Sequence, residues 1–158
     1  ALENPDYINL FSNSLGAQSV CIVIDVKKRS FSDNYDIYTH NGKTNTGEEL
    51  FKFIKKISSF DIGEIIINCI DKDGTMDGYN LNLIKRVREL VKIPLTILGG
   101  AGSLNDIKKV FDLNEIIGAA AGSLFVFKGP LKAVLINYPK GDQKKYIYPL
   151  SNISFKKE

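Results

Sequence analysis

Two acidic residues stand two positions apart in the segment Asp71-Lys72-Asp73-Gly74-Thr75. The apolar run over residues 64–69 precedes them and predicts a buried strand, and a helical pattern over residues 81–91 follows. In α/β proteins the loops between a parallel strand and its helix carry the chemistry, because they vary over a rigid sheet. In an extended segment Asp71 and Asp73 would point to one side and could share a proton, a cation or a substrate. A solvated turn is the alternative interpretation, since Asp and Gly are ordinary turn residues.

Two loops of small residues follow the next two predicted strands. Residues 93–98 run into Gly99-Gly100, and residues 115–121 run into Gly122-Ser123. Glycine lets backbone N–H groups approach a phosphate, and a helix N-terminus adds partial positive charge. Two such loops after adjacent parallel strands are typical of a barrel phosphate site. The pattern therefore predicts an anion site formed by Gly99, Gly100, Gly122 and Ser123.

The elements that must position these residues follow a strand–helix pattern, which occurs four times. Residues 4–15 predict a helix with Asn4 as its N-cap, and residues 20–24 predict a buried strand that ends at Asp25. Residues 35–39 alternate and either extend that strand or form a hairpin with it. Residues 46–49 cap an amphipathic helix. The pattern predicts a parallel α/β architecture, in a single domain over residues 1–158 with a short C-terminal extension.

Composition excludes several classes of protein. A chain of 158 residues with 44% hydrophobic content can build one core, and a dispersed net charge of +3 argues against nucleic-acid binding. No apolar run of membrane-spanning length and no secretory signal is visible. Cys21 and Cys69 fall inside predicted strands, so we expect packed thiols in a reducing, cytoplasmic compartment. His40 is the single histidine, which excludes a histidine-based metal cluster, and we expect no metal and no cofactor.

Several collinear segments resemble the cyclase subunit of imidazole glycerol phosphate synthase, the HisF family of (βα)8 TIM barrels. They cover roughly residues 1–130. Their residues are Leu2-Glu3-Asn4-Pro5, Ile24-Asp25-Val26-Lys27, Tyr38-Thr39-His40-Asn41-Gly42-Lys43, Thr46-Gly47, Gly63-Glu64-Ile65, Asp71 to Thr75, Gly78-Tyr79 and Gly99-Gly100-Ala101-Gly102. The resemblance implies a C-terminal half-barrel of about four βα units, strands five to eight. A first residue Ala1 and a single methionine, Met76, fit a truncated product.

The resemblance also implies a function, histidine biosynthesis by a lyase of the cycloligase type. The family's reaction joins ammonia from a HisH-like glutaminase partner to a phosphorylated carboxamide nucleotide, and an isolated half is expected to be inactive. Asp25 stands at the position of the fifth-strand catalytic acid or base, and Asp73 is expected beside the substrate at the active-site mouth. Glu64 matches a member of the charged ring through which ammonia enters the barrel floor. The substrate-binding residues are expected to be Asp71, Gly74, Gly99, Gly100, Gly122, Ser123 and Asn68.

Departures from the family pattern keep two alternatives open. Leu98 stands where the family usually has a phosphate-binding Ser, and Asn68 replaces a usual Thr. The segments 122–129 and 133–139 look more like paralogues that deliver ammonia for amidation of a lipopolysaccharide or flagellar glycan sugar. The other alternative is a non-catalytic half-barrel assembly module. Because four units leave raw sheet edges, two copies of the chain are expected to pair as a homodimer, with an aggregation-prone fragment as the competing outcome.

Overall fold

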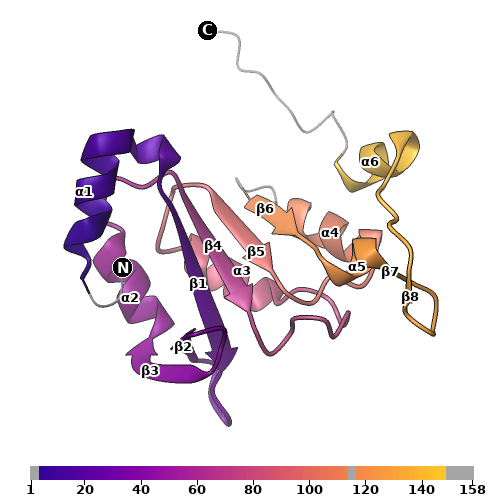
Figure 1. Cartoon of the computed structure of the whole chain (residues 1–158), viewed down its shortest axis with the longest axis horizontal. Helices are drawn as coiled ribbons and strands as arrows, with labels where there is room; N and C mark the ends of the chain where they lie inside the picture. Colours follow the sequence, from indigo (N-terminus) through magenta and orange to yellow (C-terminus); the bar gives the residue numbers. More distant parts are fainter. Residues whose placement is uncertain (1–3, 114–116, 149–158) are drawn as a thin grey trace, which may run out of the picture.

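A mixed six-stranded sheet forms the centre of the computed structural model, which describes residues 4–113 and 117–148 (Figure 1). The strand order is β3-β2-β1-β4-β5-β6. The four parallel strands are β1 (Cys21–Lys28), β4 (Glu64–Cys69), β5 (Leu95–Leu98) and β6 (Ile117–Ala120). An antiparallel hairpin, β2 (Tyr35–Thr39) and β3 (Thr44–Glu49), continues from β1 and forms one edge of the sheet.

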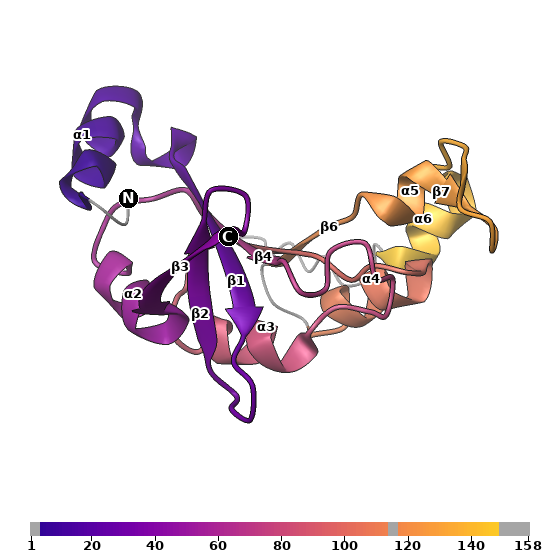
Figure 2. The same ribbon diagram turned by 60° about the horizontal axis from the view of Figure 1, so that its bottom comes forward.

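Helices follow the parallel strands and lie along one side of the sheet (Figure 2). They are α2 (Leu50–Ile57), α3 (Leu81–Arg88) and α4 (Leu104–Phe111), with α1 (Asp6–Leu15) and the short 3-10 helix η1 (Ala17–Ser19) before β1. After β6 come α5 (Ser123–Val126), the two-residue strands β7 (Phe127–Lys128) and β8 (Ala133–Val134), and α6 (Gly141–Ile147). No helix in the described ranges is long and apolar enough to cross a membrane.

The two faces of the sheet differ in burial, because successive side chains of a strand point to opposite faces. In β1, Ile22, Ile24 and Val26 are buried under the helices, in one core with residues such as Ile54 of α2. The alternate residues of β1 lie on the other face, which we call the inner face, and Val23 there is 60% exposed. The helices therefore stabilise one face only.

The register aligns one row of residues across the inner face near the carboxyl ends of the parallel strands. Asp25 pairs with Asn68, Asn68 with Leu98, and Leu98 with Ala120. The same alternation aligns a second row near the amino ends, in which Ile66 pairs with Thr96 and Thr96 with Gly118. The first row places polar groups at the edge where α/β proteins carry their chemistry.

The predicted parallel α/β architecture is confirmed as a partial (βα)8 arrangement with four strand–helix units. Several boundaries differ from prediction. The strand β1 continues three residues beyond Asp25, because its end pairs with β2 in a hairpin, the second of the two arrangements expected for residues 35–39. Residues 44–49 form β3, although residues 46–49 were expected only to cap a helix. The cap itself is confirmed at Glu49, whose side chain accepts hydrogen bonds from Phe51 N and Lys52 N at the start of α2. The N-cap of α1 is Pro5, although Asn4 Oδ1 accepts a hydrogen bond from Asp6 N at 3.0 Å.

Candidate functional site

Asp25 and Asn68 meet on the inner face, near the carboxyl ends of β1 and β4. The Nδ2 atom of Asn68 donates a hydrogen bond to Oδ1 of Asp25 at 2.8 Å, and both residues are half-buried. An amide donor fixes the orientation of a carboxylate. The second carboxylate oxygen of Asp25 has no side-chain donor among the hydrogen bonds of the described residues, so it can exchange a proton with a ligand.

Asn68 also carries an acceptor that the protein does not use. Its Oδ1 atom is buried, and no hydrogen-bond partner for it exists within residues 4–113 and 117–148. An unmade hydrogen bond at a buried oxygen is costly, by about 1–3 kcal/mol. A ligand N–H or O–H beside Asp25 would remove that cost, which makes the pair a candidate ligand-binding point.

The loop between β4 and α3 separates the two acids that the sequence placed together. Residues 71–75 form a turn, in which Lys72 N donates to Cys69 O at 2.9 Å and Thr75 N donates to Lys72 O at 3.2 Å. The expectation of an extended segment with both acids on one side is therefore wrong, because the loop's own backbone hydrogen bonds favour the turn. Asp71 is exposed. The hydrogen bond with Asp33 is the main cause that raises the pKa of Lys28, and the charge of Asp71 adds a smaller effect. Asp73 instead lines a hollow between the loops that follow β4, β5 and β6.

That hollow is where the two glycine loops come together. It lies at the carboxyl ends of β5 and β6, and Asp73 and Gly74 close it from the β4–α3 loop. Its lining residues are Asp73, Gly74, Leu98, Gly99, Gly100, Ala101, Ala120, Ala121, Gly122 and Ser123. The structure thus brings together every residue predicted for the anion site, and it adds Leu98, whose apolar side chain forms part of the lining. The Ser123 hydroxyl is close to Gly74, since a Cβ built on Gly74 would lie 3.9 Å from Ser123 Oγ.

The backbone at Gly99-Gly100 requires glycine for two reasons. Both residues have positive φ, +98° and +103°, which L side chains rarely adopt. A Cβ at Gly100 would also lie 2.3 Å from Gly78 O, and one at Gly99 would lie 2.5 Å from Cys69 O. This close approach of the two backbones allows a hydrogen bond, which Gly78 N donates to Gly100 O at 2.6 Å. The β4–α3 and β5–α4 loops are therefore joined directly through their backbones.

Tyr79 links the β4–α3 loop to the end of β6, and the sequence analysis did not assign it to the site. Its hydroxyl donates to the Ala120 carbonyl at 2.7 Å, next to the Gly122 loop. Burial, with a smaller effect of Asp106, raises the pKa of Tyr79 above its ordinary value, so the hydroxyl remains a donor at neutral pH. Gly78-Tyr79 was one of the segments that resemble the family, but that resemblance indicated no hydrogen-bond partner for the phenol.

The amino end of α4 is already occupied by a carboxylate of the chain. Ser103 caps the helix and accepts a hydrogen bond from Asp106 N at 3.2 Å, and Asp106 Oδ2 accepts from Ser103 Oγ at 2.8 Å and from Gly102 N at 3.3 Å. Burial raises the pKa of Asp106, but these hydrogen bonds outweigh it and bring the pKa below its ordinary value. An anion in the hollow would therefore rely on the loop N–H groups rather than on this helix end.

Glu64 lies at the opposite end of the sheet, at the start of β4. Thr96 Oγ1 donates to Glu64 Oε1 at 2.5 Å, and Cys21 Sγ lies 4.0 Å from Glu64 Oε2. Partial desolvation, followed by the charge of Glu64, raises the pKa of Cys21. The expectation that both thiols are packed holds for Cys69 only. Cys21 is exposed, because its strand position falls on the inner face.

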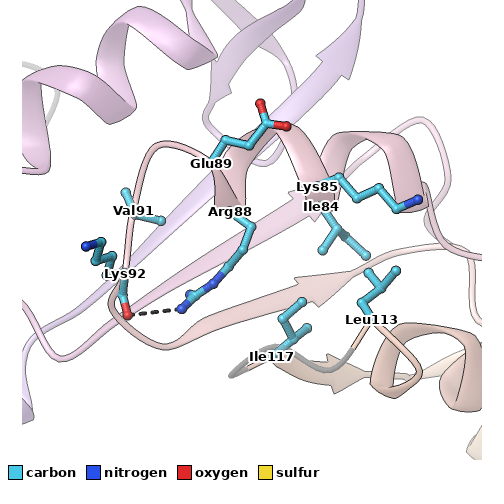
Figure 3. A pocket seen from close by; sticks show the side chains of 8 residues that line it. All are labelled: Ile84, Lys85, Arg88, Glu89, Val91, Lys92, Leu113 and Ile117. Carbon is cyan, nitrogen blue, oxygen red and sulfur yellow. Dashed lines mark hydrogen bonds between the residues drawn. The ribbon is translucent and has the colours of Figure 1, made fainter.

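The cavity shown in Figure 3 is larger and lies elsewhere. It has a volume of about 490 Å³ and is lined by Ile84, Lys85, Arg88, Glu89, Val91, Lys92, Leu113 and Ile117. Arg88 Nη2 donates to the Lys92 carbonyl at 3.1 Å and Nη1 to the Ile93 carbonyl at 2.6 Å, so this guanidinium fixes the loop before β5. None of the predicted site residues lines this cavity.

The inner face thus has two polar ends that differ in chemistry. The carboxyl end combines an oriented carboxylate, an unused amide oxygen and a glycine-lined hollow, which together suit proton transfer beside a phosphorylated ligand. The amino end has a single carboxylate held by a hydroxyl. The side chains that reach each end come from strands far apart in the sequence, which the parallel register brings together.

Comparison with known proteins agrees with this arrangement. The model of the family described as "Histidine biosynthesis protein" matches residues 1–131. A protein of Leptospira borgpetersenii, provisionally named imidazole glycerol phosphate synthase subunit HisF, is 50% identical over 94% of the chain and 59% of its own length. A provisionally named HisF subunit of Vibrio vulnificus (strain YJ016) is 47% identical over 90% of the chain and 55% of its own length.

A third relative carries the HisF name without that qualification. The imidazole glycerol phosphate synthase subunit HisF of Lactococcus lactis subsp. cremoris (strain MG1363) is 37% identical over 79% of the chain and 48% of its own length. The chain therefore spans about half the length of the curated relatives it matches. On its sequence match and its parallel βα units, the chain belongs to the histidine biosynthesis protein family and is a HisF-like protein.

Proposed function

We propose that the chain supplies half of the active site of a cyclase-type subunit of imidazole glycerol phosphate synthase. In this reaction ammonia is joined to a phosphoribulosyl carboxamide nucleotide, and the products are imidazole glycerol phosphate and an aminoimidazole carboxamide ribotide. The single observation that carries the proposal is the aligned row from Asp25 through Asn68 and Leu98 to Ala120. That row sets a carboxylate and a glycine-lined hollow on one edge of one sheet.

Asp25 is the proposed general acid or base. Its Oδ1 is held by Asn68 at 2.8 Å, so the other oxygen is positioned to take a proton from the substrate and to return it. Asp73 is proposed at the substrate mouth, because it lines the hollow while its neighbour Asp71 does not. For Asp71 we propose only contact with the substrate's outer part.

The phosphate group of the substrate is proposed to bind against the loops that line the hollow, because the hollow itself, about 10 Å³, has room for about one water. The Gly99-Gly100 and Gly122-Ser123 loops line the hollow, and the Ser123 hydroxyl lies beside Gly74. The backbone N–H groups of these loops are the proposed donors to the phosphate. A phosphate held there would be on the same edge of the sheet as Asp25. This arrangement is supported by the usual place of phosphate sites in barrels, the loops after the last two strands.

Ammonia is proposed to enter from the opposite end of the sheet, past Glu64, from a HisH-like glutaminase partner. Glu64 is the carboxylate of the second polar end, and the inner face leads from it along Ile66 to Asn68 on the same strand. Two free thiols, Cys21 and Cys69, are consistent with a cytoplasmic location as part of the proposal.

The proposal is tested in the full-length protein by turnover with the carboxamide nucleotide and ammonium salt, without a glutaminase. Formation of imidazole glycerol phosphate at a rate that depends on ammonia supports it. If the nucleotide is bound and not converted at any ammonia concentration, the cyclase function is wrong.

Amidation of a surface-glycan sugar is a second candidate, and Leu98 is the observation that favours it. Leu98 lines the hollow with an apolar side chain where a hydroxyl would serve a phosphate. A site with this lining suits a protein that delivers ammonia to a separate amidotransferase more than one that holds a phosphate tightly. Turnover of glutamine that is coupled to sugar amidation, with no conversion of the carboxamide nucleotide, would select this candidate.

A further inference from the structure

Thr96 holds Glu64, although neither the sequence pattern nor the family resemblance indicated a role for Thr96. Thr96 lies on the adjacent strand β5, 32 positions along the chain, and its hydroxyl donates to Glu64 Oε1 at 2.5 Å. A hydroxyl has one proton to donate, and Thr96 uses it here. Because a free glutamate side chain has three rotatable bonds, this short contact, more than the longer one from Cys21 Sγ to Oε2 at 4.0 Å, restrains where the carboxylate lies.

The next strand makes room for that contact. Gly118 of β6 pairs with Thr96, and a Cβ at Gly118 would lie 2.1 Å from Thr96 Oγ1. Any side chain at position 118 would therefore push the hydroxyl away from Glu64. Three consecutive parallel strands contribute to one contact, in which Gly118 leaves space, Thr96 donates and Glu64 accepts.

We propose that Thr96, in the space left by Gly118, is a positioning residue that holds the carboxylate of Glu64 against β5 and out of the path of entering ammonia. This inference rests on the proposed ammonia route and specifies how its entry is kept open. Held in this way, the carboxylate lines the wall of the inner face. Released, it could swing across the entry, where it would attract ammonium and hinder neutral ammonia.

Cys21 reports the position of Glu64 independently of any activity. Its sulfur lies 4.0 Å from Glu64 Oε2, and the thiol is exposed. The carboxylate's charge contributes to the raised pKa of Cys21, and a higher pKa lowers the thiolate fraction that reacts with alkylating reagents. Moving the carboxylate away should therefore make Cys21 react faster.

The first test measures the alkylation rate of Cys21 by iodoacetamide in the full chain, followed by mass spectrometry of the Cys21 peptide. Glu64→Gln removes the charge and should therefore give the highest Cys21 alkylation rate, with which the other variants are compared. Thr96→Val, which keeps the shape of the side chain but not the hydroxyl, should approach that rate, and Gly118→Ala should do the same. Thr96→Ser keeps the hydroxyl and should react like the wild type. A wild-type rate in Thr96→Val, with a faster Glu64→Gln, overturns the proposal.

A double variant shows whether Gly118 acts through the hydroxyl. In Thr96→Ala the hydroxyl is already absent, so adding Gly118→Ala should change the Cys21 rate no further. An additional increase of the same size as in the single Gly118→Ala variant would mean that Gly118 acts by another route, and it would overturn that part of the proposal.

The second test compares glutamine-fed with ammonia-fed turnover in the full-length protein with a HisH-type glutaminase. Thr96→Val should lower glutamine-fed turnover severalfold and leave turnover at saturating ammonium unchanged, and Thr96→Ser should restore both. An unchanged ratio in Thr96→Val overturns the positioning role. Absence of ammonia-fed turnover in the wild type would refute the proposed cyclase function instead. The alkylation rates of Cys21 would then still show whether Thr96 positions Glu64.

Discussion

Asn68 donates to Asp25 across two adjacent parallel strands, although the two residues are 43 positions apart in the sequence. The contact joins the one acid on the inner face of β1 to an amide whose other polar atom is buried and unused. The contact restrains the carboxylate, and the unused oxygen is a proposed binding point for a ligand. Two substitutions of equal shape at position 68 can separate these roles.

Replacing Asn68 should separate these two roles. Asn68→Val removes the donor, and Asn68→Thr, nearly the same in shape, keeps a hydroxyl that can donate to Asp25. A hydrogen bond to a charged group contributes about 1.5–3 kcal/mol, so the Val variant should lose about tenfold or more in kcat. The Thr variant should lose less. Equal kcat values for the two variants, measured in the full-length protein, would show that the amide does not position Asp25.

The Gly99-Gly100 backbone should tolerate no side chain. Gly100→Ala places a Cβ within 2.3 Å of Gly78 O at a φ of +103°, so we expect the free energy of unfolding to fall by about 1–3 kcal/mol. Gly122→Ala is the matched control, because its φ is −104° and no atom lies within 4 Å of the added Cβ. Urea unfolding of the two variants measures the difference, and equal losses would contradict the close-approach argument.

Restoring a hydroxyl to the hollow should strengthen phosphate binding. Leu98→Ser provides a donor on the lining, and an added hydrogen bond to an anion is worth about 1.5–3 kcal/mol. We expect the Kd for inorganic phosphate, measured by calorimetry, to fall by about tenfold. Leu98→Ala, which opens the same space without a donor, is the control. Equal Kd values for the two variants would show that the missing hydroxyl does not limit phosphate binding.

Cys69 should make stability fall at alkaline pH. Burial, followed by the charge of Asp71, raises the pKa of Cys69 to about 12 from 9.0. As pH rises above 9 the thiol ionises in the unfolded chain but not in the folded one, so the folded state binds more protons and is destabilised. The slope is at most about 1.4 kcal/mol per pH unit. Unfolding between pH 8.5 and 9.5, below the ordinary tyrosine pKa of about 10, should show a steeper fall in the wild type than in Cys69→Ala.

The homodimer of half-barrels stays a prediction. Val23 is 60% exposed on the inner face, and within the described residues no strand pairs with the outer edge of β6. Both features leave apolar surface and unpaired backbone groups that a second copy could cover. Sedimentation equilibrium of residues 1–158 at micromolar concentration should give the dimer mass. A monomer that unfolds cooperatively would contradict it.

The parts of the fold that sequence predicted well were those set by periodicity. The apolar run 64–69 became β4 with the predicted bounds, and the helix after Ser103 began where its cap required. The hairpin strand β3 was missed, because Asn45, Thr46 and Gly47 are turn residues by type. In the structure Thr46 Oγ1 donates to Ile37 O at 2.8 Å, and the register shifts there, which accommodates Gly47 at a φ of +77°.

The site shows the same division between local and long-range information. The glycine loops were predicted because glycines at strand ends have a local meaning. The contacts of Asn68 with Asp25 and of Thr96 with Glu64 depend on which strands become neighbours and in which register, and no local pattern contains that information. Residues 115 and 116 of the expected strand 115–121 lie outside the described residues.

Asp25 is the group proposed to transfer protons, and replacing it tests the proposed cyclase function most directly. Asp25→Asn keeps the size of the side chain and its contact with the residue on β4, so the unfolding transition should remain close to that of the wild type. In the full-length protein, ammonia-dependent conversion of the carboxamide nucleotide should fall by about 10²–10⁴-fold, the range that general acid–base groups supply. Wild-type turnover in a folded Asp25→Asn variant would contradict the account.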